Sequence, residues 1–231
     1  EEVVVADGHG HGAVDGTMLH PSAQLMRGWP RKWPFLLDER KYDEIAWVGQ
    51  HAKAGTVCGH LCHTGSFSLR DESINGVSVG EMGQLAMCAS ELGVRAIFAA
   101  GDEALAKEAQ ALLPGIETVA LKRGTNQEPG HHLPTEAYAR LNTAAIHLSA
   151  DEARSRIWEG ARRAAERART EKFGLIELKA PYERVSVFRS DVSNPPRVSR
   201  TQHPSSVVAL LNTPLDLRPI EAADPLRWVG T

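Results

Sequence analysis

Short apolar runs alternate with segments of helical spacing along the first half of the chain, and this alternation constrains the fold more than any other feature. Runs rich in β-branched and apolar residues predict strands at residues 3–6, 23–26, 45–49, 94–99 and 116–121. The strands at 3–6 and 45–49 are expected to be buried. Helical spacing predicts one helix over residues 81–92 and another from an Asp102 cap to Leu113. Alternation of this kind is typical of an α/β fold, in which a layered sheet has flanking helices.

A smaller C-terminal α+β part is expected to complete the same fold. Residues 67–69 and 74–79 resemble a hairpin, turning at Asn75-Gly76 or at the acidic residues before it. Later helices are expected from Pro134, over 150–172 and over 205–211, with short strands at 175–178, 186–188 and 198–201. The predicted division is an α/β metal-site domain over residues 1–130 and a helical, small-sheet part over residues 131–231.

Composition excludes several classes of protein. The formal net charge is −3, and the chain lacks the clustered basic residues that phosphate binding needs. No apolar run approaches the roughly 20 residues of a membrane span. Three cysteines, Cys58, Cys62 and Cys88, are too few for a disulfide framework. We therefore expect a cytoplasmic protein that binds neither nucleic acid nor membrane.

Histidines are crowded near the start of the chain, where six of the ten lie within the first 63 residues. His9 and His51 each follow a predicted strand, and Glu81 opens a predicted helix. The carboxyl ends of strands in an α/β sheet form the crevice where ligands bind. Two imidazoles and a carboxylate suit catalytic zinc, which keeps a fourth position for water. We predict a metal site of His9, His51 and Glu81, against the alternatives that each histidine is a separate polar loop residue or that His11 replaces His9.

His63 is the candidate catalytic residue, as a base, acid or nucleophile beside the metal. It ends the segment Cys58-Gly59-His60-Leu61-Cys62-His63. A competing interpretation makes this segment a structural metal knot. Such sites generally need a second ligand pair farther along the chain, and Cys88 lies alone in an apolar helix.

Other polar residues give weaker signals. Asp102 is expected to be a helix cap rather than a ligand. Lys122-Arg123 has two open interpretations, a carboxylate-binding pair or a solvated strand end. His131-His132, between Pro and Gly residues, is expected at the surface.

The order and spacing of several motifs resemble the zinc-dependent D-aminopeptidases of bacterial dipeptide operons. The resemblance covers roughly residues 2–127 and is looser beyond them. Its motifs are Asp7-Gly8-His9, Gly49-Gln50-His51-Ala52-Lys53-Ala54-Gly55-Thr56, Leu61-Cys62-His63-Thr64 and Ile74-Asn75-Gly76-Val77-Ser78-Val79-Gly80-Glu81-Met82-Gly83.

This resemblance implies that the residues matching His9, His51 and Glu81 bind zinc and that the residue matching His63 is catalytic. It also implies two zinc ions, a homodecamer and short peptide substrates with an N-terminal D-residue. The family carries an Asp-x-Glu strand upstream of His9 that completes the two-metal site, and this chain does not contain it. Because residues 1–6 already look like a strand, we expect further residues upstream in the native protein.

The function expected from these features is that of a metal-dependent aminopeptidase, using zinc-activated water, His63 or both. The alternative is an altered family member that keeps the fold and oligomer but only binds a ligand or a metal. Aromatic residues without core periodicity further suggest a homo-oligomer interface, namely Trp29, Trp33, Phe35 and Trp228.

Overall fold

A computed structural model of the chain describes residues 2–8, 12–28, 32–222 and 224. Its central sheet has the strand order β3-β6-β7-β8. These strands are β3 (Glu44–Gln50), β6 (Arg95–Asp102), β7 (Glu117–Gly124) and β8 (Ala145–His147). The first three run parallel and β8 is antiparallel to β7. Parallel neighbours require crossovers, and here these are the helices that the alternating pattern predicted.

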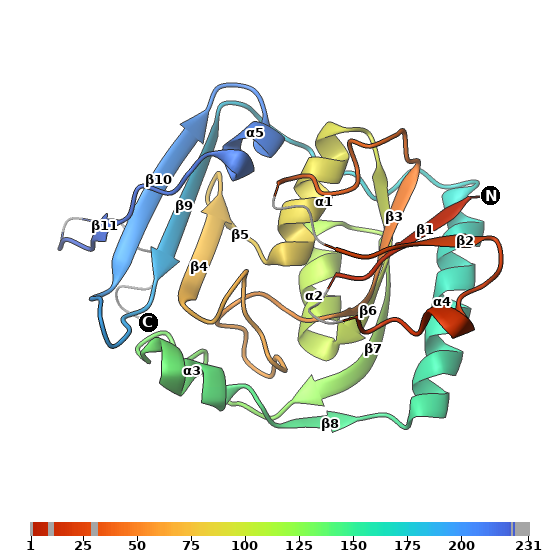
Figure 1. Ribbon diagram of the computed structural model, residues 1–231, viewed down its shortest axis with the longest axis horizontal. Helices are drawn as coiled ribbons and strands as arrows, with labels where there is room; N and C mark the ends of the chain where they lie inside the picture. Colours follow the sequence, from red (N-terminus) through yellow and green to blue (C-terminus); the bar gives the residue numbers. More distant parts are fainter. Residues whose placement is uncertain (1, 9–11, 29–31, 223, 225–231) are drawn as a thin grey trace.

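Helices cover both faces of the central sheet (Figure 1), so the predicted α/β class is confirmed. α1 (Glu81–Glu91) and α2 (Glu103–Leu112) lie on one face, and α4 (Ala150–Ala168) lies on the other. Gly160 allows α4 to approach closely, since a Cβ atom there would meet Val119 Cγ2 at 2.5 Å and Phe98 Cε2 at 2.8 Å. The core is therefore divided between the two sides of the sheet.

A second, antiparallel sheet has the strand order β11-β10-β9-β4-β5. Its strands are β4 (Leu69–Ile74), β5 (Val77–Ser78), β9 (Tyr182–Phe188), β10 (Arg197–His203) and β11 (Arg218–Pro219). β4 and β5 form the predicted hairpin, and Asn75 and Gly76 at its turn have φ values of 47° and 79°. This sheet combines two strands that precede residue 130, β4 and β5, with three that follow it.

The remaining elements are short. β1 (Val3–Ala6) and β2 (Ala23–Met26) form a parallel pair, and Gly16–Met18 is a single 3₁₀ turn between them. α3 (Thr135–Leu141) precedes β8, and α5 (Val207–Asn212) packs against α1 and the second sheet. Within the described part of the chain, no helix is both long and apolar enough to cross a membrane.

Three expectations about these elements were wrong. The strands at residues 3–6 and 45–49 are not buried. Val3 of β1 is 52% exposed, and Val48 of β3, which in the described residues pairs only with β6, is 63% exposed. Residues 175–178 form no strand, because Ile176 donates its N–H to Ser90 Oγ of α1 instead of to a neighbouring strand. Trp33 is not a free surface aromatic, since it packs against the core between α1 and α5. Trp29 and Trp228 lie outside the described residues.

Candidate metal centre

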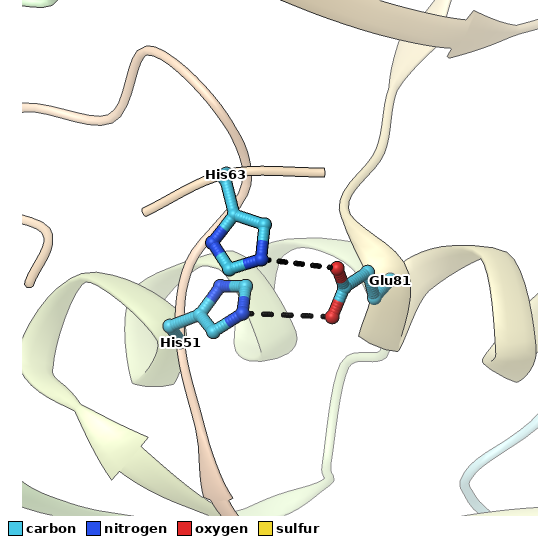
Figure 2. Close-up of side chains that lie close together, drawn as sticks. All are labelled: His51, His63 and Glu81. Carbon is cyan, nitrogen blue, oxygen red and sulfur yellow. Dashed lines mark ion pairs between the residues drawn. The ribbon is translucent and has the colours of Figure 1, made fainter. Parts of the chain in front are cut away.

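Three side chains from separate segments meet beyond the carboxyl end of β3 (Figure 2). His51 directly follows β3, His63 lies in the long loop after it, and Glu81 is the first residue of α1. One ligand atom from each lies within 4.8 Å of the others. Placement at a strand's carboxyl end agrees with the crevice rule for α/β sheets.

The two imidazoles approach the two oxygens of one carboxylate. His51 Nε2 lies 3.5 Å from Glu81 Oε2, and His63 Nε2 lies 3.5 Å from Glu81 Oε1. The imidazole rings stack with their centroids 4.0 Å apart and an interplanar angle of 26°. Both Nε2 atoms therefore point into one small volume in front of Glu81.

Backbone carbonyls fix which ring nitrogen faces the carboxylate. His51 Nδ1 lies 3.0 Å from the carbonyl of Ala52, and His63 Nδ1 lies 2.7 Å from the carbonyl of Leu61. A carbonyl oxygen can only accept, so each Nδ1 must donate its proton. In the neutral imidazole this leaves the lone pair on Nε2, facing Glu81. Metal-binding histidines are commonly held in this way by a carbonyl behind the ring.

This donor set fits a zinc ion. Two Nε2 lone pairs opposite a carboxylate repel one another, and a cation between them turns that repulsion into attraction. Neutral imidazole and carboxylate oxygen are the usual ligands of catalytic zinc. The site is also accessible, because the side chain of Glu81 is 25% exposed and that of His63 is 16% exposed.

Glu81 is itself held in place from two sides. The backbone N–H of Gly65 donates to Glu81 Oε1 at 2.8 Å, and Gln50 Nε2 donates to Glu81 Oε2 at 3.3 Å. Glu81 also stands in the first turn of α1, at the positive end of the helix dipole.

Hydrogen bonds fasten the part of this long loop that carries His63 to the part that follows His51. Tyr138 of α3 is fully buried, and its hydroxyl accepts from the N–H of Gly55 at 2.7 Å and donates to the carbonyl of Cys62 at 2.8 Å. Thr64 Oγ1 accepts from the N–H of Ala54 at 3.2 Å. These bonds keep the two histidines beside each other.

The structure brings together three of the four predicted site residues. His51 and Glu81 are neighbours, as predicted for metal ligands, and His63 joins them rather than standing apart. His9 lies outside the described residues. The roles of the four residues, ligand or catalytic group, therefore stay predictions.

The competing metal knot does not form among the described residues. The Cys62 thiol faces the carbonyl of Thr56 and the hydroxyl of Tyr138, and burial raises its pKa. The ring of His60 packs instead against the ring of His147. In the part of the chain that the structure describes, the one group of three or more candidate ligands is His51, His63 and Glu81.

Other candidates are settled individually. Cys88 is a core residue, as expected, and burial raises its pKa to about 12. Asp102 caps α2 by accepting from the N–H of Leu105. His131 is half-buried, since its ring lies against Gly55, and burial lowers its pKa to about 4. His132 is exposed, as expected.

Comparison with known proteins identifies a peptidase family. Residues 1–194 match the family model of the M55 peptidases, described as D-aminopeptidase. A D-aminopeptidase of Bacillus subtilis (strain 168) is 36% identical over 148 residues, which are 62% of this chain and 52% of that protein. The chain thus spans about half the length of this curated relative.

A solved structure shares the fold. It is described as the Zn-dependent D-aminopeptidase DppA from Bacillus subtilis, a self-compartmentalizing protease. The TM-score is 0.69 at 23% identity, with 91% of this chain and 76% of that chain covered.

Proposed function

The chain belongs to the M55 family of D-aminopeptidases, and from this premise we propose that it is a zinc-dependent aminopeptidase acting on short peptides with an N-terminal D-residue. The observation that carries the proposal is the pair of Nε2 atoms, each 3.5 Å from one oxygen of Glu81. The descriptions of the similar B. subtilis proteins name zinc dependence and activity on D-amino acids, and we propose both properties for this chain.

We assign His51 and Glu81 as zinc ligands, with His9 as the further ligand predicted from sequence. Zinc, when bound there, polarises a carbonyl and lowers the pKa of a bound water. The chain's own contribution is orientation. The carbonyl of Ala52 holds the ring of His51, and Gly65 and Gln50 hold the carboxylate of Glu81.

We assign His63 as the catalytic residue. Its Nδ1 proton is committed to the carbonyl of Leu61, so Nε2 is the atom that can take up or deliver a proton. Stacking against His51 places that atom beside the metal position. Proton transfer at this atom would assist attack on the scissile carbonyl or departure of the amine.

The proposed assembly is a homo-oligomer, with a decamer as the specific form that the resemblance implies. The similar solved structure is described as self-compartmentalizing, which supports an assembly that encloses its sites. We also propose a cytoplasmic location, since all three cysteines are free thiols.

A second candidate function is that of an altered member that binds one metal ion without hydrolysis. The observation in its favour is that the described cluster offers only three ligands, whereas a two-ion site needs more.

The two candidates are separated by assaying zinc-loaded protein on D-Ala-D-Ala and on L-Ala-L-Ala. The proposed enzyme releases alanine from the D-peptide preferentially, and Glu81→Gln abolishes that release. His132→Ala, at an exposed histidine, is the control and keeps wild-type turnover. Stoichiometric zinc binding with no release from either peptide would favour the altered member.

A further inference from the structure

Helix α2 carries a buried carboxyl group that reaches the segment after His51. Glu108 Oε2 accepts from the backbone N–H of Lys53 at 2.8 Å. Lys53 lies two residues after His51, in the same loop. Because a backbone N–H donates along a fixed direction, this bond constrains the path of the chain immediately beyond a proposed ligand.

The same carboxyl group also meets the segment before Glu81. A Cβ atom on Gly80 would lie 3.0 Å from Glu108 Oε1 and 2.9 Å from the Cβ of Lys53. The carboxyl group of Glu108 and the side chain of Lys53 therefore both pack against Gly80. Since Gly80 directly precedes Glu81, one side chain of α2 contacts the backbone beside two proposed ligands.

A second carboxyl group at the start of α2 reaches the loop that carries His63. Asp102 is fully buried, and while one of its oxygens caps the helix, Oδ2 accepts from the N–H of His60 at 2.8 Å. His60 precedes His63 by three positions in the same loop. Helix α2 is thus bonded to the loops of both histidines through acidic side chains.

The apolar packing of α2 does not explain why a carboxyl group stands at position 108. Its neighbours on the same helix face are small or apolar, at Ala104, Leu105 and Leu112. A carboxyl group in such surroundings loses its hydration, and in compensation it satisfies an N–H that would otherwise be buried without an acceptor. The position therefore serves to fix the backbone of the Lys53 loop.

We infer that Glu108 is a positioning residue of the metal centre, which sets the spacing of His51 and Glu81 by joining the Lys53 loop to the start of α1. The inference rests on the proposed function in one respect, that the centre binds zinc. It assigns Glu108 no contact with metal or substrate.

The test compares Glu108→Ala and Glu108→Gln with Glu103→Ala, a control on the same helix whose carboxylate pairs with Lys107. Zinc affinity is measured on the full chain by competition with a chromogenic chelator, with the folded fraction determined for each variant. Loss of a group that orients a ligand typically weakens metal binding 10- to 100-fold. Glu108→Ala is expected to lose affinity in that range, Glu108→Gln to lose less because its amide oxygen can accept from Lys53, and Glu103→Ala to match wild type.

A purely structural role would lower the melting temperature of Glu108→Ala but leave the zinc affinity of the folded protein within about twofold, and that result overturns the inference. Should the alanine variant fail to fold, Glu108→Asp is measured instead, because it keeps the carboxyl group but shortens the side chain by one methylene. Wild-type zinc affinity in Glu108→Asp would equally overturn the inference.

The ring resonances of His51 and His63 in metal-free protein supply a measurement that does not depend on zinc. They are expected to shift in Glu108→Ala and to stay unchanged in Glu103→Ala. Absence of zinc binding by wild type would count against the proposed function, whereas unshifted rings in Glu108→Ala count against the positioning role.

Discussion

At the scale of single residues, the hydrogen bonds behind each histidine determine the geometry of the proposed metal centre. The sequence could predict that His51 lies at a strand end, because the apolar run before it is local. It could not predict that the ring of His63 stacks on that of His51. That arrangement depends on Leu61 at a φ of 54° and on bonds from Tyr138, which lies more than seventy residues away.

The role of His63 is tested by His63→Ala. A catalytic base contributes to the barrier and little to the folded state, so peptide hydrolysis should fall about a hundredfold or more. Zinc content and melting temperature should remain near wild type. A ligand would behave differently, because its removal would release zinc together with activity. Near-normal turnover would show that the catalytic assignment is wrong.

The buried carboxyl group of Glu108 predicts a pH dependence of stability. Burial raises its pKa to about 7 from 4.5, although the backbone N–H groups of Lys53 and Gly80 and the charge of Lys53 lower it, and Asp102 adds to the rise. A raised pKa means that the folded protein binds the proton more tightly than the unfolded chain. The stabilisation is therefore fully present below pH 4.5 and is lost as the pH rises through 7.

Glu108→Gln removes this dependence. The unfolding free energy of wild type relative to the variant should fall by on the order of 3 kcal/mol between pH 4.5 and 8, measured by urea denaturation of metal-free protein. A difference that stays constant with pH would show that the carboxyl group is ionised throughout.

At the scale of elements, local sequence patterns predicted turns and helices. They did not predict strand pairing between segments that are distant in the sequence. The Asn75-Gly76 turn follows from two residues that tolerate positive φ. Pairing of β4 with β9 joins segments more than one hundred residues apart and has no local signal. Glu108 did leave a signal, a carboxylate within the apolar stripe of α2, but the sequence does not say which backbone it meets.

The docking of α4 predicts the effect of Gly160→Ala. Alanine favours a helix by about 1 kcal/mol over glycine. Here its Cβ would collide with Val119 and Phe98 of the sheet, and overpacking typically costs about 1–3 kcal/mol. The variant should therefore be less stable than wild type in thermal unfolding. Glu159→Ala, at the exposed neighbouring position, is the control and should change stability little.

At the scale of the whole molecule, the two sheets and the helices between them explain why one site draws on distant segments. β3 of the central sheet supplies His51, and α1 begins with Glu81 after the hairpin of the second sheet. The sequence predicted the α/β layers from the strand–helix alternation. It did not predict that the hairpin joins the C-terminal strands, so that α1, which follows the hairpin, lies between the two sheets.

The proposed function includes assembly of the whole molecule into a homo-oligomer. The chain has a mass of 25.1 kDa, and light scattering at micromolar concentration should give a multiple of it, with ten copies as the specific expectation. A mass equal to one chain across the concentration range would contradict the proposed oligomer while leaving the metal site untouched.

The most direct test of the central claim is a crystal structure of zinc-loaded protein with anomalous data at the zinc edge. We expect an anomalous peak about 2.0–2.2 Å from His51 Nε2 and from an oxygen of Glu81, in the volume that both imidazoles face. A zinc ion held instead by Cys58, His60 and Cys62, or rings of His51 and His63 that keep their places around Glu81 with no peak between them, would contradict it.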